Sequence, residues 1–592
     1  MKKKFYLVGM LAAGLTFAGC TDDIDDATGS GVASGDKGYV KIAINLPTTS
    51  GQSTRSANDN FDDGSANEYA VSDAYLLLFG GTDESSATLQ SWYNINTSFS
   101  RVGTDDDNIT TQSEVIKQIV KPSGENTYAL VVLNNNDNLS FTGTIEGISG
   151  AGNTVTIGDE PVSTLDNLQR ALTKEVADFI GFSSSSFTMT NAPIASLSGS
   201  NGDLTNQSVS TLVKLDVFDN QEKAEQDMDP DQIYVERVAA KVTVSYTTGL
   251  FEKDEDKNKY FATLTDAAGQ YSGDKVYLDG WYLNVTNKST KFVRDVSGWN
   301  AWKNLTNSSG SSENRFFGTH SPFRVYWAID GNYDNLTEDQ IALQNAFNIG
   351  DGNNGLITGA NVFSTPAYCL ENTMDYNHMW QRETTGIVFK MTYLFDADRN
   401  PETFYILGDP ATAEPKSGDE LVAYVNTALG SASQTFTVAL KDNPEGGYYS
   451  TVENMKNLFK KSEGDDLSDE EAFSLIEALS NETIRVYENG ATYYYASRIQ
   501  HFGNTYCPIP TGFVEDADDY TSQHLGRYGV VRNNWYEIVI NSISGPGRPT
   551  PPDPTDPTDP DNPDPDDPKD DAFINCRINI LSWAKRTQDV DL

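Results

Sequence analysis

Cysteine is scarce in this chain of 592 residues, which contains four. Cys20 ends an N-terminal apolar segment that is typical of an export signal, so Cys369, Cys507 and Cys576 would remain in the exported protein. An odd number of cysteines rules out a fully paired disulfide framework. Their spacings match no zinc pattern, and we expect buried free thiols, although a Cys369–Cys507 pair stays open. Stability must then come from packed cores.

Histidine is equally sparse, and the sequence motifs of the common enzyme classes are missing. None of the four histidines has a partner at the spacing of a metal site or a catalytic motif: His320, His378, His501 and His524. A GxSxG elbow, a Walker loop, an HExxH helix and a strand-linked GxGxxG are all absent. We therefore predict a protein that is not an enzyme and that uses no cofactor.

Positive charge is also in short supply, with 42 Lys and Arg against 85 Asp and Glu and a net charge of −43. Such a surface repels a phosphate backbone, which argues against nucleic acid as a partner. The acidic residues prompt a search for calcium loops, and Asp396, Asp398 and Asn400 do alternate. Pro401 stands where an EF-hand loop needs glycine, so this stretch is interpreted as a surface turn. No metal site is predicted, and structural calcium elsewhere stays open.

Long apolar runs are missing after residue 20, so no later segment is expected to span a membrane. The N-terminus, "MKKKFYLVGMLAAGLTFAGC", has three lysines, an apolar stretch from Phe5 to Phe17 and small residues before Cys20. This pattern predicts a bacterial lipoprotein signal over residues 1–20, with Cys20 as the lipidated first residue of the exported chain. Phe17 departs from the leucine that is usual there, and a plain cleaved signal is the alternative.

An alternating strand follows a polar tether. Residues 21–38 have almost no apolar content, and "YVKIAINLP" then places four apolar side chains on one face of a strand: Val40, Ile42, Ile44 and Leu46. The next stretch, residues 48–68, is polar and contains a single basic residue, Arg55. Exposed stretches of this kind are preferred protease sites.

Short strands with Gly, Asn and Asp turns dominate the rest of the chain, and they predict an all-β fold of two antiparallel β-sandwiches. We place an N-terminal domain at residues 56–230 and a C-terminal domain at 231–545, with no convincing sequence repeat. A helix is predicted over residues 164–180, and capping boxes predict two helical inserts that start at Thr337 and Ser468. Trp281 and Trp327 are interpreted as packing residues rather than carbohydrate platforms.

The C-terminus carries a second alternating strand behind a Pro/Asp tract. Four apolar residues share one face, and Asn575, Arg577 and Asn579 point the other way: Ile574, Cys576, Ile578 and Ile580. Residues 546–572 form a stiff, self-repelling linker that could carry the segment 573–592 to another molecule. The alternative is an edge strand of its own domain, and the residues alone do not decide between the two. Leu581 and Trp583 break the alternation, which indicates a bulge or a second pocket.

Several motifs occur in one order along the chain: the lipoprotein signal, "VKIAINLP" before a lone arginine, "VERVAAKVTV", "CLENT", "NTYCPIP" and "YGVVRNNWYEIVINSISGPGRP". Together they resemble the Bacteroidetes fimbrillin superfamily, most closely the major shaft subunit of short fimbriae of the Porphyromonas type. The resemblance covers nearly the whole chain. It implies transthyretin-like sandwich domains, a place on the cell surface and no enzymatic activity.

The resemblance also implies how the chain would assemble. Such subunits are outer-membrane lipoproteins until an arginine-specific protease cuts them, here between Arg55 and Ser56, and removes residues 21–55 with the first strand. A neighbour's C-terminal segment then fills the groove, in the order Ile574, Cys576, Ile578, Ile580, Leu581 and Trp583, and a head-to-tail filament grows. Accessory anchor and tip fimbrillins are the other expected partners. The alternative function is a monomeric outer-membrane surface lipoprotein that binds glycans; a secreted hydrolase has only fold analogy behind it.

Overall fold

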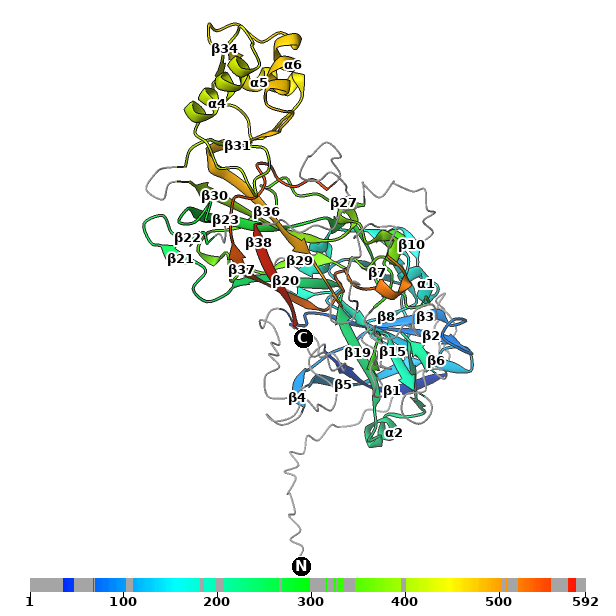
Figure 1. Cartoon of the computed structure of the whole chain (residues 1–592). Coiled ribbons are helices and arrows are strands. Elements are labelled where there is room, and N and C mark those ends of the chain that lie inside the picture. Colours follow the sequence, from blue (N-terminus) through cyan, green and yellow to red (C-terminus); the bar gives the residue numbers. More distant parts are fainter. Residues whose placement is uncertain are drawn as a thin grey trace, which may run out of the picture.

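The computed structural model describes residues 36–46, 68, 70–102, 110–181, 186–197, 207–265, 269–298, 316, 323–325, 327–333, 346–395, 401–502, 507, 520–554 and 573–581. Strands dominate this part of the chain, which confirms the predicted all-β character. Figure 1 shows three parts along the long axis of the molecule: an N-terminal sheet near the bottom, a C-terminal pair of sheets in the middle, and a helical unit at the top.

The N-terminal part is built on one large sheet with the order β4-β5-β1-β19-β14-β6-β2-β3-β8, in which β17 also pairs with β6 and β18 with β1. Its strands are β1 (Lys37–Asn45), β2 (Ala74–Gly81), β3 (Thr88–Asn94), β4 (Ser100–Val102), β5 (Thr110–Val120), β6 (Asn126–Leu133), β8 (Ala151–Gly152), β14 (Met189–Asn191), β17 (Val213–Leu215), β18 (Val217–Phe218) and β19 (Asp231–Arg237).

Both faces of the central strands of this sheet are buried. In β2, Leu76 and Leu78 contribute to one core, and Leu77 and Phe79 contribute to another. Period-two alternation places successive side chains on opposite faces, so a run such as "LLLF" requires cover on both sides. Part of that cover comes from a small sheet of β7 (Leu139–Thr142), β9 (Thr154–Ile157) and β10 (Glu160–Pro161).

The C-terminal part has two sheets around one core. The first has the order β29-β20-β37-β38, and the second the order β21-β22-β23-β30-β36, with β28 beside β23. Val242 and Ile540 from the first sheet share a core with Phe389 and Tyr494 from the second. The strands are β20 (Ala239–Tyr246), β21 (Glu252–Asp254), β22 (Lys259–Thr263), β23 (Lys275–Asn284), β28 (Ile357–Thr358), β29 (Ala367–Leu370), β30 (Gly386–Leu394), β36 (Ala491–Arg498), β37 (Trp535–Ile543) and β38 (Ile574–Leu581).

The two parts repeat one pairing pattern that the sequence did not reveal. In each, the opening strand runs parallel to a strand much later in the sequence, as β1 does to β19 and β20 does to β37. An antiparallel strand flanks each pair on both sides, giving β5-β1-β19-β14 and β29-β20-β37-β38. The sheets are therefore not purely antiparallel as predicted, because β19 and β37 return over long connections that leave their direction unconstrained by a hairpin.

The chain changes from one part to the other at Val238, between β19 and β20. The predicted boundary at 230 and 231 falls before β19, which belongs to the N-terminal sheet by its pairing. A buried ion network lies at this junction. Arg294 Nε donates to Glu236 Oε1 (2.9 Å), and Arg532 Nε donates to Glu371 Oε2 (2.8 Å). All four side chains are buried, and losing one partner would leave a buried charge, so the network holds the two parts together.

A helical unit is inserted between β30 and β36, which pair directly with each other. It contains β31 (Phe404–Leu407), α4 (Gly418–Ser431), β32 (Val438–Leu440), β33 (Gly447–Tyr449), α5 (Val452–Leu458), β34 (Phe459–Lys461), α6 (Asp469–Ala478) and β35 (Ile484–Tyr487), around a core of its own. The predicted helix start at Ser468 is confirmed by its capping box with Glu471. The start predicted at Thr337 lies outside the described residues.

The helix predicted over residues 164–180 is wrong. The segment forms a short helix α1 (Leu165–Leu168), then β11 (Ala171–Thr173) and a 3-10 turn η2 (Val176–Phe179). Leu168 and Phe179 are still buried in one core, so the apolar spacing reported burial correctly. The helix breaks because β11 pairs with β25 (Ser289–Lys291), and that ladder replaces the helical hydrogen bonds.

The remaining elements are short. They are β12 (Ile180–Gly181), β13 (Ser186–Phe187), β15 (Ile194–Leu197), β16 (Gln207–Ser210), α2 (Gln221–Gln226), β24 (Thr286–Asn287), β26 (Phe323–Arg324), η4 (Gly331–Tyr333), β27 (Phe347–Asn348), η6 (Gly359–Asn361), η7 (Tyr376–His378), η8 (Gln381–Glu383), η9 (Glu488–Gly490) and η11 (Ser522–His524).

Candidate assembly site

The first predicted strand lies inside the N-terminal sheet as β1 (Figure 1). Its alternating apolar side chains are at most 1% exposed and belong to one core: Val40, Ile42, Ile44 and Leu46. Burying an aliphatic side chain of this kind contributes about 1.5–3 kcal/mol. The strand is therefore held firmly by packing as well as by backbone pairing.

Three strands flank β1: β5 lies on one side, and β19 lies on the other together with β18, which pairs with Tyr39 and Val40 in antiparallel register. β5 pairs with it from Lys37 to Asn45 in antiparallel register, and β19 pairs with it in parallel register from Ile42 to Asn45. In the described part of the chain, β5 has no other neighbour in the sheet than β4 and β1. Without β1, the sheet would contain a slot between β5 and β19 that is lined by the core side chains of both.

The outward face of β1 makes polar contacts with β5, with β19 and with Asp227 at the end of α2. Lys41 Nζ donates to the carbonyl oxygen of Asp227 (2.6 Å) and lies 3.7 Å from Glu114 Oε2. Asn45 is 3% exposed; it donates to Gln232 Oε1 (3.0 Å) and accepts from Gln112 Nε2 (2.9 Å). A cation and an amide at fixed positions therefore supplement the apolar pattern.

The rim of the slot is acidic. Asp231 Oδ2 accepts a hydrogen bond from the backbone nitrogen of Asp216 (2.8 Å). The negative charges of Asp216, Asp227 and Asp229 also act on the Asp231 carboxylate. Burial, with the charges of these three neighbours, raises the pKa of Asp231 to about 6. The ionised rim thus favours a strand that brings positive charge.

The predicted C-terminal strand is β38, at the edge of its own C-terminal sheet, where it pairs with β37. Ile574 is 5% exposed, and Cys576 and Ile578 pack half-buried against the same core. Arg577 is exposed on the opposite face and donates to Asn541 Oδ1 (3.3 Å). In the single chain, the alternative of an edge strand is thus the arrangement present. Backbone pairing continues to Ile580 and Leu581, and Trp583 lies outside the described residues.

The start of the predicted linker lies on the C-terminal domain. Tyr493 and Arg548 exchange two backbone hydrogen bonds of 2.9 and 2.7 Å, and Asn284 Nδ2 donates to the carbonyl oxygen of Pro552 (3.1 Å). Residues 546–554 are therefore attached, and the free part of the predicted linker can begin only after Pro554.

The predicted lipidation and cleavage residues, Cys20, Arg55 and Ser56, lie outside the described residues. Glu68, 13 positions after Arg55 in the sequence, is described and is 2% exposed. Its carboxylate lies 2.8 Å from Lys241 Nζ and accepts from the Tyr368 hydroxyl (2.6 Å). Sequence reasoning missed this anchor, which ties Glu68 to β20 and β29 in the first sheet of the C-terminal part.

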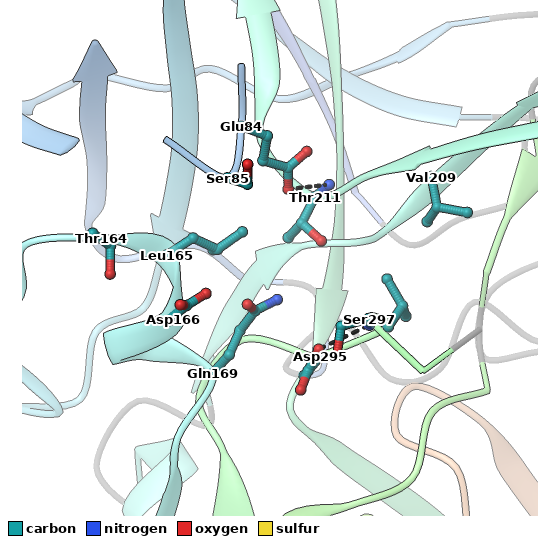
Figure 2. A pocket seen from close by; sticks show the side chains of 11 residues that line it. Glu84, Ser85, Thr164, Leu165, Asp166, Gln169, Val209, Thr211, Asp295 and Ser297 are labelled. Atoms are coloured by element: carbon teal, nitrogen blue, oxygen red, sulfur yellow. Dashed lines mark hydrogen bonds between the residues drawn. The ribbon is translucent and has the colours of Figure 1, made fainter. Parts of the chain in front are cut away.

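A pocket of about 250 Å³ with a mixed polar and apolar lining lies beside α1 (Figure 2). Glu84 Oε1 accepts from the backbone nitrogens of Thr211 (2.9 Å) and Leu212 (3.2 Å), and Asp295 Oδ1 accepts from that of Ser297 (2.9 Å). Burial raises the pKa of Glu84. The carboxylates of Glu84 and Asp295 thus accept hydrogen bonds from backbone nitrogen atoms. The lining is Glu84, Ser85, Thr164, Leu165, Asp166, Gln169, Val209, Thr211, Asp295, Val296 and Ser297, without an aromatic side chain.

Other candidates from the sequence have structural roles. Trp281 and Trp327 are both fully buried, which confirms their interpretation as packing residues. His501 Nδ1 lies 2.9 Å from the Tyr536 hydroxyl, and His378 Nδ1 lies 2.8 Å from Glu383 Oε2. Cys369 and Cys507 are buried, and neither they nor Cys576 form a disulfide in the described part of the chain. Among the described residues, no group of three or more His, Cys, Asp or Glu is arranged to hold a metal ion.

None of the helices in the described ranges is long and apolar enough to cross a membrane. No curated protein matches the sequence. A fimbrial assembly protein from Parabacteroides distasonis ATCC 8503 aligns at 11% identity over 61% of this chain and 83% of its own, with a TM-score of 0.24. A putative adhesin from Bacteroides ovatus aligns at 8% identity over 86% of this chain and 92% of its own, with a TM-score of 0.21. Neither likeness is close enough to support an argument.

A family comparison is more informative. Residues 485–589 match the model of the C-terminal region of fimbrillin, the major fimbrial subunit protein type IV. The matched region runs from β35 through β36 and β37 and includes the edge strand β38. Residues 485–589 are thus similar to the C-terminal region of fimbrillins, and the predicted resemblance of the chain to that family is confirmed.

Proposed function

We propose that this protein is a structural subunit of a cell-surface fimbria that polymerises by exchange of one strand for another. The subunit is exported as an outer-membrane lipoprotein through Cys20, cleavage after Arg55 frees β1, and the C-terminal strand of a neighbouring subunit takes its place. The family match at residues 485–589 supports the fimbrial assignment.

The position of β1 carries the mechanism. β1 is a central strand, yet only residues 46–73 connect it to β2, and Arg55 falls within that connection. A cut there leaves β1 attached by packing and hydrogen bonds alone. Loss of the strand would expose an apolar slot between β5 and β19, and such a slot favours the addition of another alternating strand.

The position of β38 supports its role as the incoming strand. Among the described strands β38 pairs with β37 alone, so it can leave without disrupting the centre of its sheet. The Pro/Asp segment from residue 555 to residue 572 extends at about 3 Å per residue where it is stretched, which gives a reach of several tens of ångströms. Because the slot and the strand belong to different sheets of one subunit, the contact is head-to-tail, and such a contact grows a filament where its rotation does not close a ring.

The test is the variant Arg55→Ala, with Arg170→Ala as a matched control because Arg170 is exposed in the N-terminal part. Arg55→Ala should give a folded, exported protein that keeps its lipidated N-terminus and forms no filaments. Arg170→Ala should be processed to a mature N-terminus at Ser56 and should polymerise. N-terminal sequencing and electron microscopy of surface-extracted protein provide the readout. Normal filaments from Arg55→Ala would contradict cleavage as the trigger.

A further inference from the structure

The resident strand and the C-terminal strand share more than alternation. Residues 38–46, "GYVKIAINL", align without a gap to residues 572–580, "AFINCRINI". We propose that the donated strand enters the slot in the same direction as β1 and in this register, with Arg577 paired to Glu114 of the receiving subunit. This inference rests on the proposed function and specifies the fit of the two partners.

The entrance of the slot selects a small residue. A Cβ atom at Gly38 would lie 2.8 Å from Val217 Cγ1 and 2.9 Å from Lys121 Cε, so the position is crowded. The alignment places Ala572 there, whose single Cβ atom requires the side chains of Val217 and Lys121 to shift, and a larger side chain would require more. Phe573 then takes the place of Tyr39, and an aromatic ring follows the small residue in both strands.

The inward positions match along the strand. The four buried aliphatic residues of β1 are replaced in order by Ile574, Cys576, Ile578 and Ile580. A shift by one residue would turn these side chains outward and bring Asn or Arg into the core. Only even shifts therefore compete with the proposed register.

The buried amide excludes the even shifts. Asn45 bonds to both flanking strands through Gln112 and Gln232, and the alignment brings Asn579 to the same position. A shift of two residues would place Leu581 or Arg577 there, and the two glutamines would lose their shared partner. Buried polar groups of this kind fix register, because an unpaired one is costly.

The donated strand carries one positive charge on its outward face, as β1 does, but two residues further along. Lys41, which lies 3.7 Å from Glu114 Oε2, is replaced by Asn575, and Ala43 is replaced by Arg577. Ala43 stands directly opposite Glu114 in the ladder between β1 and β5. Ala43 is fully buried, so the Arg577 stem has to run along the strand into the space that Lys41 vacates. The guanidinium then faces the same carboxylate.

The direction needs a separate argument, because "INCRINI" reads almost the same from both ends around Arg577. A reversed strand would also place an asparagine at the position of Asn45, with Asn575 in the role of Asn579. It would, however, bring the aliphatic Leu581 to the position of Tyr39, whereas the forward strand brings the aromatic ring of Phe573 there. The small residue followed by an aromatic ring fits only the forward direction.

Disulfide cross-linking in filaments can test direction and register with one acceptor. Ile116 lies directly opposite Lys41 in the ladder and is half-buried, so Ile116→Cys is a mild change. It is combined, in a Cys576→Val background, with one of three donor changes: Asn575→Cys, Arg577→Cys or Asn579→Cys. Cleaved precursor is allowed to polymerise, oxidised mildly and run on a non-reducing gel.

The proposal predicts a ladder of covalent oligomers from Asn575→Cys and little from the other two. A ladder from Arg577→Cys would show a shift of two residues, and a ladder from Asn579→Cys would show a reversed strand; either result overturns the proposal and leaves strand exchange standing. Filaments without any cross-link would also overturn it. If the Cys576→Val parent, cleaved at Arg55, forms no filaments while the unaltered chain does, the parent is replaced by Cys576→Ala. If the unaltered chain forms none, the proposed function itself fails.

Discussion

A substitution in β1 distinguishes the uncut precursor from the mature filament, because under the proposed function β1 is present only in the precursor. Ile44 is fully buried in the centre of β1, and β1 is present in the precursor. Under the proposed function, β1 has left the mature filament, where a neighbour's strand occupies the slot. Ile44→Ala should therefore weaken the precursor and leave the filament unchanged.

The expected magnitude follows from the burial of Ile44. Replacing a fully buried isoleucine by alanine costs about 2–5 kcal/mol, because the removed atoms leave a cavity in the core. We take about 3 kcal/mol as the loss in the strand's hold on its slot. Since about 1.4 kcal/mol corresponds to a factor of ten, the cut strand should be released about a hundredfold faster.

Three measurements check this prediction. Thermal melting of the uncut precursor should show a lower transition for Ile44→Ala, light scattering after proteolysis should show faster polymer growth, and denaturant resistance of the finished filaments should equal that of the unaltered protein. Ile406→Ala is the matched control, because Ile406 is equally buried in a core that keeps its strand. It should lower stability without faster growth. Weaker filaments from Ile44→Ala would refute the release of β1.

Two further predictions concern the incoming strand and the rim of the slot. Ile578→Asp should abolish filaments in electron micrographs. The melting temperature of this monomer should fall no more than it does on deletion of residues 573–592, because Ile578 is only half-buried at a sheet edge. Arg577→Ala, on the exposed face, should still polymerise. Asp231→Asn should stabilise the precursor at pH 8. Because the pKa of Asp231 is raised to about 6 in the folded protein, its ionisation above pH 6 lowers the stability of the unaltered protein. The unaltered protein regains this stability as the pH falls from 6 towards 4. Chemical denaturation at pH 8 and pH 4 should show the gap between the two proteins closing by about 1–2 kcal/mol after allowance for partial exposure, and a gap that widens at pH 4 would contradict this assignment.

The sequence could predict those elements that depend on residues close together in the chain. The alternation of Val40, Ile42 and Ile44 identified a strand with one buried face, and the pair Ser468 and Glu471 identified the start of α6. Both depend on residues within a few positions of one another. The same rule applied to Ser417 and Glu420 would have found α4, with Leu421, Val425 and Leu429 as its buried face. That signal was present in the sequence and was overlooked.

Pairing partners could not be predicted, because alternation fixes which face of a strand is buried but not which strand lies beside it. β19 pairs with β1 although about 190 residues separate them, and it therefore belongs to the N-terminal sheet rather than to the domain that the sequence boundary assigned. The pattern of residues 574–580 is equally compatible with the edge of β37 and with a slot in another molecule. The helix predicted over 164–180 failed for the same reason, since its hydrogen bonds went to β25.

The same ambiguity gives the proposed exchange its direction. At the edge of its own sheet, β38 pairs with one strand over eight residues, whereas the slot offers β5 over nine residues and β19 over four. The donated strand therefore gains a second ladder and full burial of a face that is half-buried at the edge. It gives up its contacts with β37, whose core-facing side chains, such as Ile540, lose cover in return. In the proposed mechanism cut β1 is a separate peptide that stays at the membrane through Cys20 and does not travel with the filament, so mass action favours the neighbour's strand even where the two ladders are equally strong.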